Sequence, residues 1–426
     1  MLPRLCVLVA LVCGLVSGEP MTCRAADNAP QKFVLTSATT NQQIGHFELT
    51  HLDVENGGDI PWRVQKKTLH GGKQEGSELI TVDNGKLQIV IVPTRGMNIL
   101  EVRSGDVRLG WDSPVKEVVH PKFIDLDTRG GLGWLDGFNE WMVRCGLEFA
   151  GHPGKDVFTT NTGDRAEMDL TLHGKIGNIP SSEVVLIVDS EPPHRLRVRG
   201  VVYERMFFGP KLQLVTEIST VPGSDELTIE DVVTNQGAGE QEIELIYHVN
   251  YGAPLLEEGA QVHVPAKRIA PMNDHAASGL DRWNTYAGPT PGYIEQVYLV
   301  EPISDRSGQS LALLRNAAGD RGTSIRWNVE QLPYFTVWKN TTAVADGYVT
   351  GLEPATGYPY NRRVERAAGR LATLDAGESR TFRLDFGLHV GTEAVEQVAG
   401  TIRRIQGETQ PEILRTPPEM PDTGDE

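Results

Sequence analysis

Residues 195–233 read RLRVRGVVYERMFFGPKLQLVTEISTVPGSDELTIEDVV, and this stretch carries the clearest sign of the fold. Apolar and polar residues alternate over three segments within it, residues 195–206, 211–219 and 227–233, as they do in strands that bury one face. Gly, Pro and Asp between the segments are typical turn residues. Parallel strands would need a crossover helix between neighbours, so antiparallel pairing is expected.

The same alternation recurs along most of the chain from residue 85 onward, with hardly any helix between the segments. It predicts an all-β protein, a large antiparallel β-sandwich with few short helices. One short helix is expected over residues 134–143, and an amphipathic one over residues 393–405. The further predicted strands are residues 86–92, 183–188, 242–250, 310–315, 324–329, 334–340 and 381–389.

One main domain is expected, because no linker or internal repeat divides the 426 residues and a large β-sandwich can exceed 200 residues as a single unit. The sandwich is assigned to residues 61–405. Residues 27–60 form an N-terminal extension, and residues 406–426 form an acidic, Pro-rich tail. Both flanking segments are expected to be loosely ordered at best.

The N-terminus has the pattern of a secretory signal peptide. Arg4 precedes an apolar run over residues 5–16, and the small residues Ser17 and Gly18 follow. The run is too short to span a bilayer, which takes roughly 20 residues. We therefore expect cleavage near residue 18 or 26, export to the periplasm or the medium, and no membrane anchor after the signal is removed.

The amino-acid composition limits the classes of binding partner. The chain has 40 Lys and Arg against 57 Asp and Glu, a net charge of −17, which disfavours nucleic acid and anionic membranes. A neutral sugar or glycan is unaffected by that field. The sequence has no phosphate loop, GxSxG motif or metal-binding spacing of His and Cys, so neither a cofactor nor a metal is expected. The oligomeric state is not predicted.

The four cysteines do not form a disulfide framework, since Cys6 and Cys13 lie in the signal. A bridge from Cys23 to Cys145 depends on where the leader is cleaved. Cys145 is interpreted as a small buried hydrophobe rather than a nucleophile, because no base is suggested nearby.

Two histidines are candidate site residues. In the strand over residues 242–250, His248 lies on the face opposite the apolar residues, where it could serve chemistry or simply top a solvated face. His173, in LHGKIGNIP (residues 172–180), follows a strand pattern and precedes a Gly, so a tight turn could present its imidazole to a cavity. A similar LHGG contains His70, and the local pattern does not choose between the two turns.

Two charged residues join them. Glu353, in GYVTGLEPATGYP (residues 347–359), is expected in a Gly-rich loop with aromatic neighbours that would raise its pKa and stack on sugar rings. Arg95, in VPTRGMNI (residues 92–99), could grip adjacent hydroxyls, although an ordinary salt bridge is an equal alternative.

Several long motifs resemble the aldose-epimerase-like family called domain of unknown function 4432, over residues 62–389. They are TRGGLGWLDGFNEWMVRCGLEFAGHPG (128–154), LHGKIGNIP (172–180), LIYHVNYGAPLLE (245–257), LPYFTVWKN (332–340) and GYVTGLEPATGYP (347–359). The order of Arg95, an HG turn, a strand histidine and Glu353 is similar to that in aldose 1-epimerases and hexose-6-phosphate mutarotases. This resemblance implies the galactose mutarotase supersandwich, and it favours His173 over His70, which precedes Arg95.

The resemblance also implies roles. Glu353 would be the catalytic base, His248 the acid, His173 the first histidine and Arg95 the substrate arginine. Asp281, in GLDRWNTY, is the candidate for the family's aspartate. His248 is followed by VNYG where epimerases have Tyr-Phe, which leaves the substrate open.

Lys339 and Trp338, at the end of FTVWKN, are further candidates for the walls of the site, although Trp338 could equally be core.

The expected function is that of a sugar isomerase related to aldose 1-epimerases. Glu353 would take the proton from the anomeric hydroxyl O1, and His248 would protonate the ring oxygen O5. The alternatives are a non-catalytic carbohydrate-binding or sensing protein, and an epimerase or lyase that acts on a modified sugar or a polysaccharide.

Overall fold

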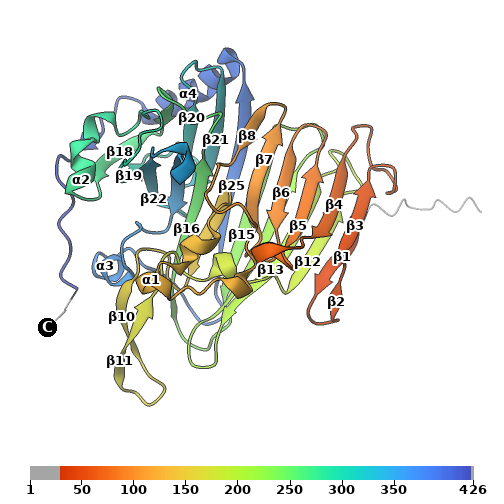
Figure 1. Cartoon of the computed structure of the whole chain (residues 1–426), viewed down its shortest axis with the longest axis horizontal. Coiled ribbons are helices and arrows are strands. Elements are labelled where there is room, and N and C mark those ends of the chain that lie inside the picture. Colours follow the sequence, from red (N-terminus) through yellow and green to blue (C-terminus); the bar gives the residue numbers. More distant parts are fainter. Residues whose placement is uncertain (1–28, 424–426) are drawn as a thin grey trace, which may run out of the picture.

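Two large sheets packed face to face form the fold (Figure 1). The computed structural model describes residues 29–423, so the predicted signal peptide and Cys23 lie outside the described residues. Sheet I has ten strands, in the order β17 (Gln261–His263), β20 (Gln309–Arg315), β21 (Arg321–Asn328), β25 (Ser379–Val390), β15 (Glu226–Asn235), β14 (Lys211–Thr220), β13 (Leu196–Arg205), β12 (Glu183–Val188), β1 (Gln31–Ser37) and β2 (Gln42–Gln43).

Sheet II has fourteen strands, and its pairs are antiparallel apart from the short β18–β26 pair. The order is β26 (Glu412–Ile413), β18 (Ala266–Pro271), β19 (Gln296–Pro302), β22 (Tyr334–Asn340), β23 (Val349–Ala355), β16 (Gln241–Tyr251), β9 (Met142–Leu147), β7 (Asn98–Ser104), β6 (Gln88–Val92), β5 (Glu78–Asp83), β4 (Arg63–Thr68) and β3 (His46–Thr50), with β24 (Ala372–Leu374) beside β16 and β8 (Val107–Leu109) beside β7.

Short elements surround the sheets. The β10–β11 hairpin (Gly154–Thr159 and Arg165–Leu170) projects below them in Figure 1. The helices are α1 (Thr128–Gly131), α2 (Asp274–Ser278), α3 (Arg362–Ala367) and α4 (Thr392–Gln406). The 3₁₀ turns are η1 (Gly72–Gln74), η2 (Pro121–Phe123), η3 (Gly133–Gly137), η4 (Ile176–Asn178), η5 (Leu280–Arg282) and η6 (Val344–Asp346). No helix within residues 29–423 combines the length and apolarity needed to cross a membrane.

Alternation along the strands builds the main core between the sheets. Val198 on β13 lies opposite Ile218 on β14, and both point toward sheet II. Tyr247 and Val249 on β16 point back from sheet II into the same core. Each such aliphatic side chain contributes roughly 1.5–3 kcal/mol to the stability of the fold when fully buried. The two-residue alternation along each strand therefore supplies the apolar contacts that hold the two sheets together.

The ten predicted strands are confirmed, with ends that shift by a few residues. The amphipathic helix is confirmed as α4, whose buried Val395, Ala399 and Ile402 pack on Leu311 and Leu313 of β20. Cys145 on β9 is buried with a free thiol, as predicted for a small hydrophobe, and burial raises the pKa of that thiol well above its usual range.

Three expectations are wrong. The segment over residues 134–143 is not one helix, because it contains part of η3 and then enters β9. Residues 31–50 are not loosely ordered, because β1 pairs with β12 and β3 pairs with β4. Glu353 lies in strand β23 rather than in a loop. In the tail, β26 pairs with β18.

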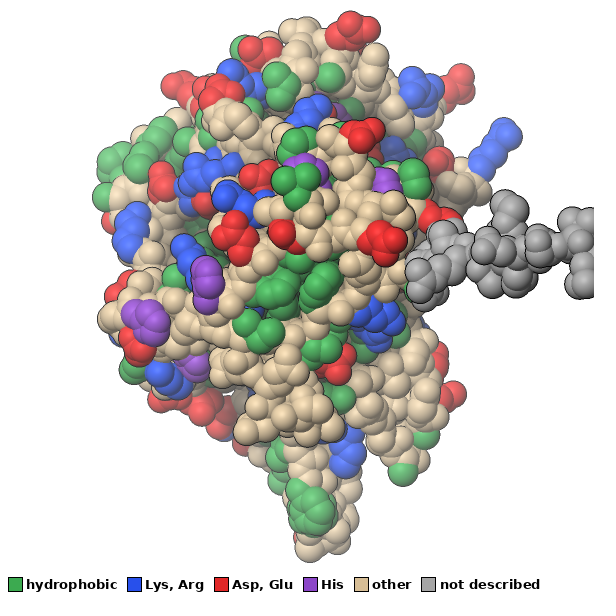
Figure 2. All heavy atoms as spheres, turned by 90° about the vertical axis from the view of Figure 1, so that its right-hand side faces the viewer, with side chains coloured by type: hydrophobic (Ala, Val, Ile, Leu, Met, Phe, Trp, Pro, Cys, Tyr) green, Lys and Arg blue, Asp and Glu red, His purple; other side chains and the backbone are tan. Residues whose placement is uncertain are grey.

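The surface mixes charges of both signs. Figure 2 looks onto the side where β1 and β3 lie in Figure 1, and acidic and basic side chains are interspersed across it. The net charge of −17 is therefore not gathered into one acidic patch on that face.

A buried ion pair joins the two sheets. Arg144 on β9 of sheet II contacts Asp231 on β15 of sheet I through two nitrogens, at 2.5 and 3.0 Å, and both side chains are fully buried. The Tyr247 hydroxyl donates to the same carboxylate, and Arg144 also donates to Thr216 and to the backbone carbonyl of Met97. All of these bonds lie within the apolar core, where an unpaired charge would be costly.

We predict that Arg144→Met lowers the free energy of unfolding by about 3–5 kcal/mol, because it leaves the Asp231 carboxylate buried without its partner. Urea denaturation measures the loss. The matched control is Arg383→Met, which removes a half-exposed arginine paired with Asp385 on the surface and should cost under about 1 kcal/mol. Equal losses in the two variants would contradict the assignment of the inter-sheet pair as a main stabilising contact.

Candidate functional site

A cavity of about 400 Å³ opens on the face of sheet II that points away from sheet I. Three adjacent strands supply its floor: β16 carries His248, β23 carries Glu353, and β22 carries Thr336 and Trp338. Because neighbouring residues on β16 face the core, strand alternation alone directs His248 to this outer side. The remaining lining residues are His152, His173, Glu295, Leu132, Trp134, Leu135, Phe138, Pro153, Leu172, Val297 and Pro359.

His248, Glu353 and His173 come together in this cavity. His248 Nε2 lies 3.3 Å from Glu353 Oε1. The ring of His173 stands nearly perpendicular to that of His248, with centroids 5.2 Å apart. His173 itself has φ of 60°, and the following Gly174 has φ of 71°, so the predicted tight turn is real and points its imidazole inward. These three predicted residues therefore share one site.

The tautomer of each histidine follows from its partners. Asn250 Nδ2 donates to two backbone carbonyls, those of Glu140 and His248, so its Oδ1 is left as an acceptor. His248 Nδ1 lies 2.7 Å from that Oδ1 and must carry the hydrogen. His173 Nδ1 lies 3.0 Å from the carbonyl of Ala150, which can only accept. Both histidines thus keep Nε2 for the cavity.

Burial sets the protonation of the site. Desolvation lowers the pKa of His248 well below its ordinary 6.5, and the neighbouring His173 lowers it further. Desolvation lowers the pKa of His173 to about 4. The pKa of Glu353 is raised well above its ordinary 4.5, first by desolvation and then by the charge of Glu295. Burial in this cavity consequently favours neutral imidazoles and a protonated Glu353.

Several buried polar atoms in the cavity wall lack partners among the described residues. Oε1 of Glu353 makes no well-formed hydrogen bond despite its approach to His248, and the Thr336 hydroxyl and the Trp134 indole nitrogen also have none. An unpaired buried polar group costs roughly 1–3 kcal/mol, so these atoms favour a ligand with hydroxyl groups.

Gly351 makes room for the carboxylate. A Cβ at this position would lie 2.5 Å from Glu353 Oε1 and 3.1 Å from His248 Cε1. Any larger residue would therefore push Glu353 away from His248. Trp338, on β22 beside Gly351, is held by a 2.7 Å hydrogen bond from its indole nitrogen to Glu295 at the mouth of the cavity.

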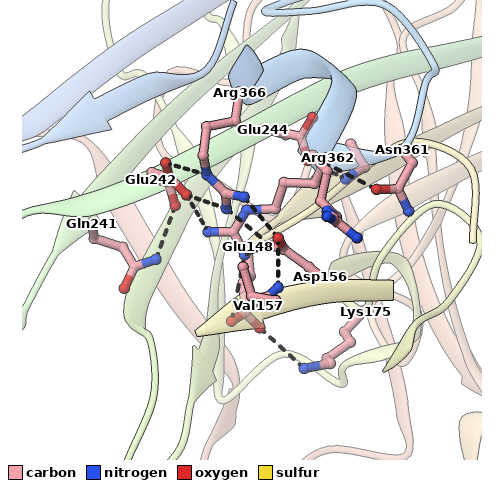
Figure 3. Close-up of polar contacts among 12 residues, drawn as sticks. Glu148, Asp156, Val157, Lys175, Gln241, Glu242, Glu244, Asn361, Arg362 and Arg366 are labelled. Carbon is pink, nitrogen blue, oxygen red and sulfur yellow. Dashed lines mark hydrogen bonds and ion pairs between the residues drawn. The ribbon is translucent and has the colours of Figure 1, made fainter. Parts of the chain in front are cut away.

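A charged cluster braces the wall of the site (Figure 3). Arg366 on α3 donates to Asp156 on β10 and to Glu242 on β16, which ties the hairpin to sheet II. Nearby, Glu244 accepts from the Ala150 backbone N–H at 3.2 Å, and the carbonyl of Ala150 is the group that orients His173. Desolvation raises the pKa of Glu244 to about 8. These carboxylates are not among the described lining residues of the cavity; they fix the hairpin and the backbone at Ala150 that lie next to it.

Arg95 does not enter the cavity, so the structure does not place it against a sugar there. Its side chain is fully buried, its Nε lies 2.5 Å from Glu140, and one Nη donates to the Val119 carbonyl. Gly137 packs so closely that a Cβ there would be 2.3 Å from an Arg95 nitrogen. The salt-bridge alternative is the one observed, and Arg95 stabilises the backbone around Glu140, whose carbonyl holds Asn250.

Lys339 and Asp281 lie elsewhere. Trp338 lines the cavity, and its strand neighbour Lys339 points to the opposite face of β22 into a second cavity. Asp281 lies at the rim of that second cavity and pairs with Arg415 at 2.6 Å. Of the four predicted wall and substrate residues, the structure brings only Trp338 to the site.

Several lining residues were not anticipated. Trp134 and Phe138, from the Gly-rich segment, contact the rings of His173 and His248 edge-on. Thr336 was detectable in principle, since it shares a strand face with Trp338. Glu295 had no local signal. Over residues 29–423, no three His, Cys, Asp or Glu side chains are grouped as metal ligands would be.

Known proteins resemble this chain in sequence and in fold. The family described as domain of unknown function (DUF4432) matches residues 74–388. A structure from Klebsiella pneumoniae subsp. pneumoniae MGH 78578, described as a "putative aldose 1-epimerase", is 43% identical with a TM-score of 0.86, and the match covers 92% of this chain and 100% of that chain. No curated protein matches the chain.

A galactose mutarotase-like protein from Clostridium acetobutylicum is more distant. It is 16% identical with a TM-score of 0.52, and the match covers 75% of this chain and 97% of that chain. At this identity the likeness concerns the fold alone. The predicted galactose mutarotase-like sandwich is confirmed.

The buried His173 predicts an acid-sensitive fold. Its pKa is about 4 in the folded chain against an ordinary 6.5, so the unfolded chain binds the proton first as the pH falls. Relative to His173→Asn, the wild type should lose about 1.4 kcal/mol of unfolding free energy per pH unit between roughly 6.5 and 4. Asn tolerates the positive φ.

Denaturant titrations at a series of pH values measure this difference. Between pH 7 and 8 the difference should stay constant, since neither state of the chain protonates this group there. A difference that is flat down to pH 4 would show that His173 is not held neutral.

Proposed function

The chain belongs to the family described as domain of unknown function (DUF4432), and on that premise we propose that it is an aldose 1-epimerase-like isomerase that opens and recloses the ring of a sugar. The observation that carries the proposal is the 3.3 Å approach of His248 to Glu353 inside a cavity of single-sugar size. O1 and O5 of an aldose are bonded to the same carbon, so an acid and a base that act on them must lie this close together.

The two groups share one proton, which is what the reaction needs. In the ring-closed complex Glu353 is ionised and His248 carries a proton on Nε2. Glu353 takes the proton from O1 while His248 protonates O5, the C1–O5 bond breaks, and C1 becomes the aldehyde carbon. After rotation about the C1–C2 bond, each group returns or recovers its proton and the ring closes as the other anomer.

The buried surroundings favour the ring-open intermediate of this reaction. Once the ring is open, Glu353 is protonated and His248 is neutral, and these are the forms that burial favours. The dry cavity therefore stabilises the open-chain state relative to the charged pair. Asn250 supports the reaction by holding the His248 hydrogen on Nδ1, so that Nε2 is the atom that exchanges protons with O5.

The walls suit a neutral sugar. Trp134, Phe138 and Trp338 offer aromatic faces to the apolar side of a pyranose. No lining residue is Lys or Arg, and Glu295 places a negative charge at the mouth. The proposal extends to the exported location implied by the N-terminal pattern, which would place the substrate in the periplasm or outside the cell.

We expect Glu353→Gln and His248→Asn each to slow anomer interconversion by about 10²- to 10⁴-fold, because each variant removes one partner of the proton exchange. The assay follows a panel of aldoses by polarimetry or NMR exchange. Glu330→Gln, in an exposed turn between β21 and β22, is the matched control and should retain the wild-type rate.

Full activity in Glu353→Gln would refute the assigned base. Saturable binding of a sugar without any acceleration would favour the non-catalytic sensor instead.

We expect the protein to discriminate between sugars by the charge of the sugar. A neutral hexose is expected to react with at least about tenfold higher kcat/KM than its 6-phosphate or its uronic acid, because no Lys or Arg among the described lining residues offsets the burial of a second negative charge beside Glu295. Competition between paired sugars in the NMR assay measures the ratio. Preference for the anionic sugar would contradict the neutral-substrate assignment without affecting the acid–base pair.

A further inference from the structure

A second cavity, of about 670 Å³, lies on the other face of β22 from the first. Lys339 and Thr341 at the end of β22 form part of its wall, and η5 and the residues after it form another part. The catalytic proposal uses none of these residues. This cavity is therefore argued on its own contacts.

Lys339 is a buried cation without an anionic partner. It is 4% exposed, and its Nζ donates to the backbone carbonyls of Arg282 and Thr285, each at 2.7 Å. The rings of Tyr286 and Tyr298 lie 5.1 and 5.8 Å away. Carbonyls and rings orient the ammonium but carry no negative charge, and no ion pair among residues 29–423 includes Lys339.

A second cation lies beside it. Arg282, an exposed residue, lines the same cavity, and its charge, after burial, helps to lower the pKa of Lys339 to about 8. Two carboxylates occur in the wall. Asp281 is already paired with Arg415 at 2.6 Å, and exposed Glu258 forms no ion pair with either cation in the described part of the chain. Neither cation thus has an ion-pair partner in the described part of the chain.

Neutral donors complete the wall. Gln296 Oε1 accepts from the Tyr293 hydroxyl at 3.0 Å, and the Tyr298 hydroxyl shares its one hydrogen between that Oε1 and the Ala276 carbonyl, each at 3.1 Å. The amide nitrogen of Gln296 is left as a donor. Thr341 is 1% exposed, and its Oγ1 makes no well-formed hydrogen bond among the described residues, although it lies within interaction distance of the Tyr293 hydroxyl. An oxyanion would satisfy this hydroxyl and the two cations together.

We propose that the second cavity binds the oxyanion of a small ligand, a phosphate, sulfate or carboxylate group. Lys339 and Arg282 neutralise its charge, and Thr341 and Gln296 donate to its oxygens. The tyrosine rings in the wall, Tyr286 and Tyr293, accommodate the organic part of the ligand. The site is independent of the isomerase proposal, since it lies on the opposite side of β22.

Calorimetric titration of the full chain with inorganic phosphate, sulfate and acetate tests the site, at pH 7, low ionic strength and constant chloride. At least one anion should bind at one site per chain. Arg282→Gln and Thr341→Val should each weaken binding at least about threefold, and Lys339→Met more than about tenfold, since charge-assisted hydrogen bonds are the stronger ones. Tighter phosphate than acetate identifies a phosphate ester, and the reverse order a carboxylate.

Controls separate binding from folding. Arg306→Gln changes an exposed arginine outside the cavity and should bind as the wild type does, whereas Glu258→Gln should bind more tightly because it removes an opposing charge. Lys339→Met also removes the ammonium that holds two carbonyls. If that variant fails to fold, Arg282→Gln and Thr341→Val still decide the question.

The pH dependence of anion affinity is a separate test of the site. Sulfate has a constant charge above neutrality, so its affinity should fall between pH 7 and 9 as Lys339, with a pKa of about 8, loses its proton. The absence of binding by all three anions would overturn the proposal. Binding that is unchanged in both Arg282→Gln and Thr341→Val would overturn it as well.

Discussion

The buried contact of Arg144 with Asp231 is the interaction on which the site depends. Here the two sheets meet through an ion pair rather than through aliphatic packing, and the Tyr247 hydroxyl donates to the same carboxylate. Arg144 lies opposite Tyr247 in the β9–β16 pairing, and Val143 lies opposite His248. The same register that directs the ion pair into the core therefore directs His248 outward to the cavity floor.

The proposed acid–base pair then depends on which strands are neighbours and on how deeply they are buried. Strand β23 lies next to β16, so Glu353 reaches His248 across adjacent strands without any loop to position it. Rigid strands hold the acid–base geometry, and the aromatic cover of Trp134 and Phe138 keeps the floor dry. Desolvation raises the pKa of Glu353 and lowers that of His248, so burial favours the shared proton on Glu353.

The sequence predicted secondary structure correctly where apolar and polar residues alternate regularly, and it failed where they do not. β23 contains Gly351, Glu353 and Pro354, residues typical of turns, so its pattern indicated a loop. A strand results because β16 and β22 pair with it on both sides, and Gly351 is required by the room that the Glu353 carboxylate occupies. Tertiary pairing overrode propensity at the position of Glu353.

The sequence by itself determined the all-β sandwich, the outward face of His248 and the family resemblance that singled out His173 and Glu353, because periodicity and motif order are properties of the chain. Only the tertiary structure decided that Arg95 is buried against Glu140 and that Lys339 faces a second cavity. A charged side chain takes whichever partner the packing brings within a few ångströms, and that distance is set by strands far apart in sequence.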